Sequence, residues 1–394
     1  MKLKKVMATK IQDSRKEDTI QVMIKTEKDE FVASAPSGKS KGRFEAPYYV
    51  RSIGHDINVI NKYFKNKRQL RIDEFKGLNI IEQSFEKKIG ANSMIALESA
   101  ILKAVASDNG KEVWEFLNPK ARKLPYLVGN CIGGGLHSVP HIPVFQEFLC
   151  IPIASVAESI NINKKVHEHA AEILRKKDHK FTHKTNDENA WQTFLNHDQV
   201  LELMLELKRF VIDNFTIRFN IGIDIAASSF FGKTYKYEKF RLKREEQIEY
   251  ISSLLNKKGI FYAEDPVQEN DFSGFSKILN NLHNKNHLIV GDDLTVTNID
   301  RLNEAIKLKS INAIIIKPNQ SGSLIAVKNV VDFARRKGIK TVFSHRSGET
   351  HDNILADLAV AWRADFFKAG IFGKEREAKL NRLKEIETLI NKKT

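Results

Sequence analysis

Short apolar runs recur along the second half of the chain, and each ends in a charged or polar residue. From one closing residue to the next, the intervals are 40, 28, 25, 28 and 23 residues. Parallel neighbouring strands need a crossover of a dozen or more residues, so this spacing predicts strand, helix, strand units. The runs are FNIGID, GIFYAED, HLIVGDD, INAIIIK, KTVFSH and ADFFK, which close on Asp224, Glu264, Asp292, Lys317, His345 and Lys368.

These closing residues would meet at one end of an α/β barrel. The carboxyl ends of the strands in such a barrel form the mouth in which active sites lie. One polar residue at a strand end is usually only solvated, but six in succession favour a site, because clustered charges are costly unless they bind something. The acids Asp224, Glu264 and Asp292 offer only oxygen ligands, which favours Mg²⁺ or Mn²⁺ over Zn²⁺.

The first part of the chain has a different pattern. IQVMIK and EFVASA alternate apolar and polar residues around KTEKDE, which predicts a β-hairpin within residues 10–35. Three segments with helical periodicity follow, and Asn92 is a candidate cap of the third. Pro119 and Pro125 mark a connection, from which strands and helices begin to alternate. We predict a small α+β capping domain over residues 1–122 and an α/β, TIM-like barrel over residues 123–394.

Composition narrows the class of protein. A chain of 394 residues can bury a large core. The two cysteines, Cys131 and Cys150, provide no disulfide framework and indicate a reducing compartment. No apolar run approaches the roughly 20 residues that cross a bilayer, and the basic amino-terminal segment leads directly into charged sequence. We therefore expect a cytoplasmic protein without a membrane partner.

The net charge of +15 could serve nucleic-acid binding, membrane contact or the steering of an anionic substrate. The lysines are scattered along the chain, whereas a nucleic-acid site favours a clustered stripe with interleaved aromatic residues. We interpret the charge as a solvated, lysine-rich surface and expect no nucleic-acid partner.

A series of longer motifs extends over nearly the whole chain. SHRSGET and GDDLTVTN are the most specific, because neither follows from a fold alone. The others are DSR, SGKSKG, GAN, GGLH, QEF, DE, GIDIAAS, EDP, KPNQSGSL and EREAKLNRL. With these motifs in this order, the chain resembles the enolases. The resemblance implies the reversible dehydration of 2-phosphoglycerate to phosphoenolpyruvate and water, in glycolysis and gluconeogenesis, by a homodimer or higher homo-oligomer.

The resemblance also implies a role for each site residue. Lys317 is the implied base, and Glu188 is the acid that protonates the leaving hydroxyl with help from Glu147. Removing a proton beside a carboxylate adds negative charge, which Mg²⁺ held by the three acids would stabilise; a Lys base beside Mg²⁺ is a known feature of the enolase superfamily. The base needs a lowered pKa, for which the metal and Lys368 are candidate causes.

The remaining implied residues bind the substrate. His137 and His345 resemble the family's mobile and fixed histidines, and Arg346 and Ser347 its phosphate contacts. Ser40 lies in a lid between Gly38 and Gly42, and would help to hold a second Mg²⁺ that arrives with the substrate. The implied substrate contacts are Ser40, His137, Glu147, Arg346, Ser347 and Lys368.

Some supporting turns depart from the family. Lys39 and Lys41 stand in the lid, where the family has small or hydroxylated residues, and Ser229 replaces a glutamate. Gly133 stands where the family has asparagine, and one additional residue follows the nearby His137.

The segment after Glu188 departs most. The family's Gly-Gly-Phe-Ala-Pro is replaced here by NAWQT, residues 189–193. If the family glycines have positive φ, Asn189 would tolerate that conformation and Ala190 would be strained.

Other functions stay open on the sequence alone. ASAPSGKS, residues 33–40, nearly matches the phosphate loop of ATPases, although Gly42 and Pro47 follow where a helix should begin. The altered turns would suit a paralogue with a shifted substrate. The charge would suit a non-catalytic protein that binds nucleic acid or a surface, but such a protein has no need of Lys317, Glu188 and the metal carboxylates.

Overall fold

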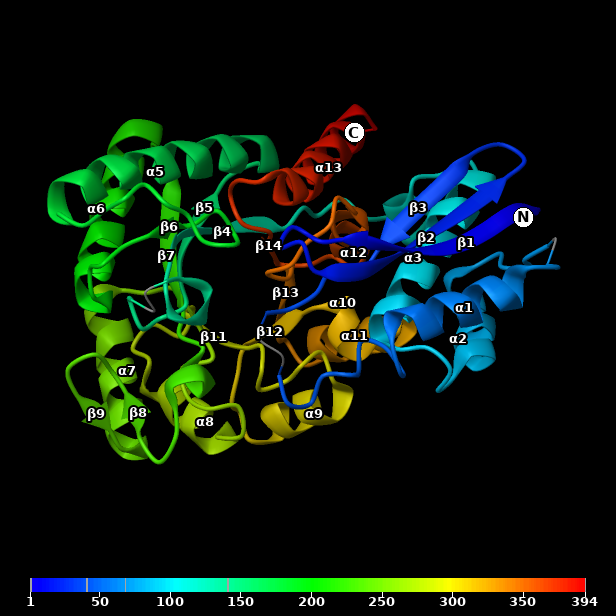
Figure 1. Cartoon of the computed structure of the whole chain (residues 1–394). Coiled ribbons are helices and arrows are strands. Elements are labelled where there is room, and N and C mark those ends of the chain that lie inside the picture. Colours follow the sequence, from blue (N-terminus) through cyan, green and yellow to red (C-terminus); the bar gives the residue numbers. More distant parts are fainter. Residues whose placement is uncertain (1, 40–41, 68, 140–141, 394) are drawn as a thin grey trace.

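The computed structural model describes residues 2–39, 42–67, 69–139 and 142–393. Its amino-terminal part contains a three-stranded antiparallel sheet (Figure 1). β2 and β3 pair from Gln21 opposite Ser34 to Lys25 opposite Glu30, which confirms the predicted hairpin. The strands are β1 (Leu3–Gln12), β2 (Asp18–Thr26) and β3 (Glu30–Ser34).

Helices cover this sheet on one side. α1 and α3 contact its strands, and α2 packs on α3. The predicted cap of α3 is wrong: the helix begins at Ala91 after Gly90, and Asn92 instead donates to the Pro36 carbonyl at 3.0 Å. Gly90 is required there because a Cβ would lie 2.4 Å from the Tyr48 carbonyl oxygen. The elements are α1 (Ile53–Phe64), η1 (Phe75–Gly77), α2 (Leu78–Phe85), α3 (Ala91–Asp108) and α4 (Val113–Leu117).

The second part is a closed barrel of eight strands. Pairing of β14 with β4 closes the sheet, and β6 (Trp191–Gln192) adds to β4 outside the circle. The barrel strands, in order around the circle, are β4 (Tyr126–Gly133), β5 (Glu147–Ile153), β7 (Arg218–Asp224), β10 (Tyr262–Glu264), β11 (Leu288–Gly291), β12 (Ala313–Ile316), β13 (Lys340–Ser344) and β14 (Phe366–Lys368).

The predicted alternation of parallel strands and helices begins later than expected. β5 is antiparallel to both β4 and β7, and two consecutive helices, α5 (Val156–Lys177) and α6 (His197–Phe215), separate β5 from β7. From β7 onward all barrel strands are parallel, as the six apolar runs predict. The start of β5 therefore lies beside the end of β7, with Glu147 opposite Asp224.

Alternating residues along the barrel strands belong to two separate apolar layers. On β12, Ala313 and Ile315 pack in a small cluster with Val128, while Ile314 and Ile316 join the larger core. This period of two is that of a barrel whose strands point side chains alternately inward and toward the surrounding helices. The later helices and short elements are η2 (Gly135–His137), η3 (Ala227–Phe230), β8 (Tyr235–Lys236), β9 (Arg241–Leu242), α7 (Arg244–Lys258), α8 (Phe272–Asn281), α9 (Ile299–Lys307), α10 (Pro318–Ser321), α11 (Leu324–Arg336), α12 (Ile354–Ala361) and α13 (Lys374–Lys392).

The two parts contact one another beside the barrel mouth. Asn319 donates to Asn92 Oδ1 at 3.1 Å, and Lys103 pairs with Asp352 at 2.7 Å. The predicted boundary between residues 122 and 123 falls in the segment that joins α4 to β4, and it stays a prediction.

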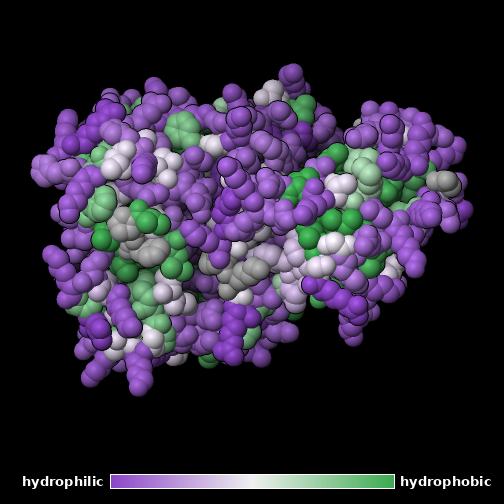
Figure 2. Space-filling view, viewed as in Figure 1, coloured by the Kyte–Doolittle hydropathy of each residue, from purple (hydrophilic) through white to green (hydrophobic). Residues whose placement is uncertain are grey.

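The outer surface is largely hydrophilic on the face shown in Figure 2, with apolar residues in small groups. Within the described residues, none of the helices has both the length and the apolar character that a bilayer crossing requires.

Candidate active site

A cavity of about 380 Å³ lies at the carboxyl ends of the parallel barrel strands. Glu264 is fully buried next to it, and Ser40 lies outside the described residues. The other predicted site residues line the cavity: His137, Glu147, Glu188, Asp224, Asp292, Lys317, His345, Arg346, Ser347 and Lys368.

The ends of the barrel strands explain why these residues meet. Asp224 and Lys368 end β7 and β14, while Lys317 and His345 follow β12 and β13 directly. Glu147 begins its strand, but β5 runs in the opposite direction, so this carboxylate reaches the same mouth.

Lys368 binds three buried carboxylates at once. Its Nζ lies 2.8 Å from Glu147 Oε2, 3.1 Å from Asp224 Oδ2 and 2.9 Å from Glu264 Oε2. Burial raises the pKa of Asp224 to about 6, and burial together with the charge of Asp224 raises the pKa of Glu264 to about 7. Burial lowers the pKa of Lys368, but attraction to the three carboxylates outweighs it and raises this pKa well above the ordinary value.

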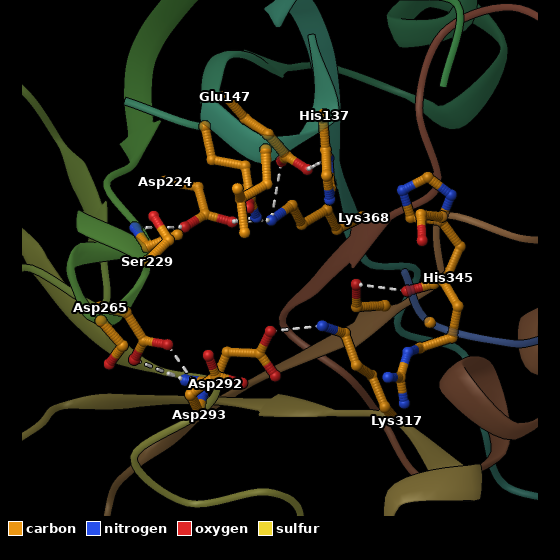
Figure 3. A pocket seen from close by; sticks show the side chains of 18 of the residues that line it. His137, Glu147, Asp224, Ser229, Asp265, Asp292, Asp293, Lys317, His345 and Lys368 are labelled. Carbon is orange, nitrogen blue, oxygen red and sulfur yellow. Dashed lines mark hydrogen bonds and ion pairs between the residues drawn. The ribbon is translucent and has the colours of Figure 1, made fainter. Parts of the chain in front are cut away.

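Lys317 forms a second ion pair, with Asp292 Oδ2. Burial, Arg346 and Lys368 all lower the pKa of Lys317, but the charge of Asp292 outweighs them and raises it to about 12. A neighbouring cation was predicted to lower the pKa of Lys317. The described protein groups alone do not lower it, because the nearest charged partner, Asp292, is an anion. Figure 3 shows the Lys317 and Asp292 pair facing the Lys368 cluster across the open cavity.

Two groups of side chains are close enough to share one ion. Among the described residues, ligand atoms of Asp265, Asp292 and Asp293 lie within 4.8 Å of one another, as do those of His137, Glu147 and Glu188. The predicted trio of Asp224, Glu264 and Asp292 does not form such a group here, because separate lysines hold its members.

The predicted trio nevertheless suits a hard divalent cation. Its members offer only oxygen, and Glu264 Oε1 is buried without a hydrogen-bond partner among the described residues. Asp265 is less suited, because its two oxygens accept the backbone N–H groups of Asp292 and Asp293 at 3.0 and 2.8 Å.

Glu188 lies between an amide donor and two histidines. Asn130 donates to Glu188 Oε2 at 3.1 Å, His137 Nδ1 is 3.6 Å from Oε1, and His345 Nε2 is 3.8 Å from Oε2. Burial lowers the pKa of His137 to about 4, so this imidazole is neutral at pH 7. Burial raises the pKa of Glu147 to about 7.

The turn after Glu188 is held by contacts of its own. Asn186 Oδ1 accepts from the backbone N–H groups of Glu188 and Ala190, each at 3.0 Å. Asn189 has φ 61°, the conformation that asparagine was expected to tolerate. Ala190 does not have positive φ, so its expected strain is absent.

Lys39 contacts residues on both sides of the cavity. Lys39 donates its backbone N–H to Ser347 Oγ at 2.7 Å, and its ammonium lies 3.2 Å from Asp187. Gly38 and Gly42 have no positive φ. Glycine is required at position 42 because the backbone passes close to Asp293. A Cβ there would lie 2.9 Å from Asp293 Oδ1.

The ATPase alternative does not fit this loop. Within residues 35–39 and 42–52 there is no helix, and α1 begins only at Ile53. A phosphate loop needs a helix at this point because the helix N-terminus binds the phosphate.

Sequence reasoning missed several residues around Arg346. Its guanidinium contacts Glu45, Tyr48 and Asn319, and Gln320 contacts Asp292. Asn319 and Gln320 follow Lys317 in KPNQ, so that motif held the signal. Glu45 and Tyr48 are far from the strand ends in sequence, and no periodicity marks them.

Family models match both parts of the chain. The model described as the N-terminal domain of enolase matches residues 3–117, and that of the enolase C-terminal TIM barrel domain matches residues 121–394. The proteins with similar sequences include the enolase of Methanocorpusculum labreanum, 37% identical over 395 residues, which cover 97% of this chain and 98% of that protein. The enolase of Archaeoglobus fulgidus is 34% identical over 389 residues, 96% of each chain.

Proposed function

The chain belongs to the enolase family, and from this premise we propose how its residues carry out the reaction. The protein is a lyase, a phosphopyruvate hydratase of glycolysis. It interconverts 2-phosphoglycerate with phosphoenolpyruvate and water. The supporting observation is that one cavity gathers Lys317, Glu188, the buried carboxylate of Asp224 and the partly buried carboxylate of Asp292.

Lys317 takes the proton from the carbon beside the substrate carboxylate, and Glu188 donates a proton to the hydroxyl that leaves from the next carbon. Glu147, with its pKa raised to about 7, supports Glu188 across His137. Arg346 and Ser347 bind the phosphate, and Lys368 contacts the substrate on the side of its carboxylate. His345 remains neutral, because burial lowers its pKa well below the ordinary value.

We assign Asp224, Glu264 and Asp292 as ligands of Mg²⁺, with a second Mg²⁺ that accompanies the substrate at Ser40. When bound, Mg²⁺ supplies positive charge beside the developing dianion of the substrate. Asp292 Oδ2 is also the atom that Lys317 contacts, so coordination through this oxygen would remove the main cause of the raised pKa of Lys317.

The family further implies a homodimer or higher homo-oligomer and a cytoplasmic location. The small-molecule substrate is the partner for which the cavity provides contacts, and the reaction requires neither a membrane nor a nucleic acid.

Conversion of 2-phosphoglycerate with and without Mg²⁺ tests the assignment. We expect turnover that needs Mg²⁺ and falls by about 10³-fold or more in Lys317→Ala and in Glu188→Gln, since each removes a proton-transfer group. Lys328→Ala is a matched control, because Lys328 pairs with Asp332 on α11 and does not line the cavity. Lack of turnover in the unmodified protein, or full activity of Lys317→Ala, would contradict the assignment.

A further inference from the structure

Glu45 connects parts of the cavity that are distant in sequence. Its Oε1 accepts the backbone N–H of Gly42 at 3.0 Å, at the end of the SGKSKG loop. Both of its carboxylate oxygens accept from Arg346, each at 3.0 Å. The side chains of Glu45 and Arg346 are each only 4% exposed, so solvent does not screen this pair.

The residues that hold Arg346 in position include Glu45, Tyr48 and Asn319. Besides the two-pronged contact with Glu45, Nη2 donates to Tyr48 at 2.9 Å and Nη1 donates to Asn319 at 3.1 Å. These contacts fix the plane of the guanidinium. The four Nη hydrogens are all used in these contacts, so a phosphate must share or replace some of these acceptors, and it meets a guanidinium whose plane is already fixed.

Gln320 connects Glu45 to the metal side of the cavity. Its Nε2 donates to Asp292 Oδ1 at 3.0 Å and to Glu45 Oε1 at 3.4 Å. Its Oε1 accepts from Thr297 at 2.8 Å, which fixes the orientation of the amide. Gln320 is buried, so it cannot replace these partners with water.

We propose that Glu45 is a positioning residue for phosphate binding by Arg346, and that Gln320 couples this position to Asp292. Cation binding at Asp292 weakens the hydrogen bond that this carboxylate accepts from Gln320, which strengthens the donation of the same amide group to Glu45 and holds the carboxylate that orients Arg346 more firmly. Metal binding thereby increases the affinity of Arg346 for phosphate. This inference depends on the proposed function, in which Arg346 binds the phosphate.

The direction in which Glu45→Gln changes phosphate affinity distinguishes a positioning role of Glu45 from simple charge neutralisation. If Glu45 only cancelled the charge of Arg346, Glu45→Gln would leave the guanidinium more positive and phosphate would bind more tightly. If Glu45 positions Arg346, the loss of the two-pronged contact outweighs the gain in charge, and phosphate binds more weakly.

The first experiment measures binding of inorganic phosphate to the full chain by calorimetry in the presence of Mg²⁺. We expect about tenfold weaker binding in Glu45→Gln, the size usual for loss of a residue that orients a binding group. The KM for 2-phosphoglycerate should rise similarly while kcat changes less, because Arg346 holds the phosphate and takes part in neither proton transfer. Glu45→Asp keeps the charge and should recover part of the affinity.

Glu387→Gln is the matched control. Glu387 is also a buried carboxylate, but it accepts the N–H groups of Val156 and Ala157 at the start of α5, away from the cavity. Its substitution should lower the unfolding temperature without changing phosphate affinity. Unchanged or tighter phosphate binding in folded Glu45→Gln would overturn the positioning role.

The second experiment tests the connection through Gln320. The phosphate dissociation constant is measured without and with Mg²⁺, and the ratio of the two is the coupling factor. We expect Gln320→Leu to reduce this ratio about fivefold or more, whereas Gln247→Leu, at a buried amide that contacts Tyr237 and Pro266, should leave it unchanged. An unchanged ratio in Gln320→Leu would overturn the coupling. Absence of phosphate binding in the unmodified protein would instead contradict the proposed function.

Discussion

Single residues can replace a family turn when they satisfy its backbone geometry. Asn189 has φ 61°, and its Nδ2 donates to the Phe372 carbonyl at 3.3 Å. Its own carbonyl is 2.9 Å from Nε2 of His167. Asparagine is among the few residues that adopt this conformation at low cost, so the turn keeps Glu188 at the cavity without the glycines of the family.

Substitutions at Asn189 should therefore rank by backbone preference. We expect Asn189→Ala to destabilise the protein by roughly 1–2 kcal/mol, because alanine adopts positive φ at that cost. It should also lower kcat, since Glu188 is the preceding residue. Asn189→Gly should lie nearer the unmodified protein, because it loses the amide contact without backbone strain. Urea unfolding and kcat measure both effects, and equal behaviour of the two variants would contradict the explanation.

At the scale of elements, the ends of the parallel strands were predictable and the direction of β5 was not. Six apolar runs closing on polar residues placed Asp224, Lys317 and Lys368 at one mouth, because residue order alone locates the end of a strand. The direction of β5 depends on its pairing with β4 and β7, which apolar periodicity does not record. Glu147 was recognised only through the resemblance, since it begins a strand.

Contacts between elements also limited the site prediction. The Lys317 pKa depends on which buried charge lies nearest, and the Glu45 contact joins residues about 300 positions apart. The pattern of residues along the chain does not record which side chains lie next to Lys317 or that Glu45 lies next to Arg346. The motifs identified the chemistry of the cavity, whereas its electrostatics required coordinates.

Helix α5 carries a buried histidine that should make stability depend on pH. The ring of His167 stacks on Trp191 with centroids 4.6 Å apart, and burial lowers its pKa to about 4. The ordinary value is 6.5, so the folded state favours the neutral ring. Its contribution is fully present above pH 6.5 and is lost as the pH falls toward 4.

The variant His167→Gln isolates this effect, because other groups titrate equally in both proteins. The free energy of unfolding should fall more steeply for the unmodified protein than for the variant as the pH decreases from 6.5 to 4. The difference between these two pKa values corresponds to roughly 3–4 kcal/mol at most. Urea unfolding at intervals of pH measures the difference, and parallel curves would exclude His167 as the cause.

At the scale of the whole molecule, the two domains meet around opposite charges. Arg346 of the barrel binds Glu45 of the amino-terminal domain, and Lys103 binds Asp352 in the reverse sense. The cavity between them concentrates acids although the chain carries a net charge of +15. Removing one partner of a buried ion pair leaves the other charge uncompensated. These contacts therefore connect the packing of the two domains with the charges of the cavity.

Addition of Mg²⁺ should therefore stabilise the whole protein, and more strongly at higher pH. The pKa values of Asp224 and Glu264 are raised to about 6 and about 7, so in the metal-free protein their contribution to stability is lost as the pH rises through this range. Ionised ligands also bind the metal best. The difference in unfolding temperature with and without Mg²⁺ should grow between about pH 6 and pH 8. Asp224→Asn, which removes one ligand charge, should reduce this difference, and a Mg²⁺ effect that is equal at all pH values would contradict the assignment of these carboxylates as the metal site.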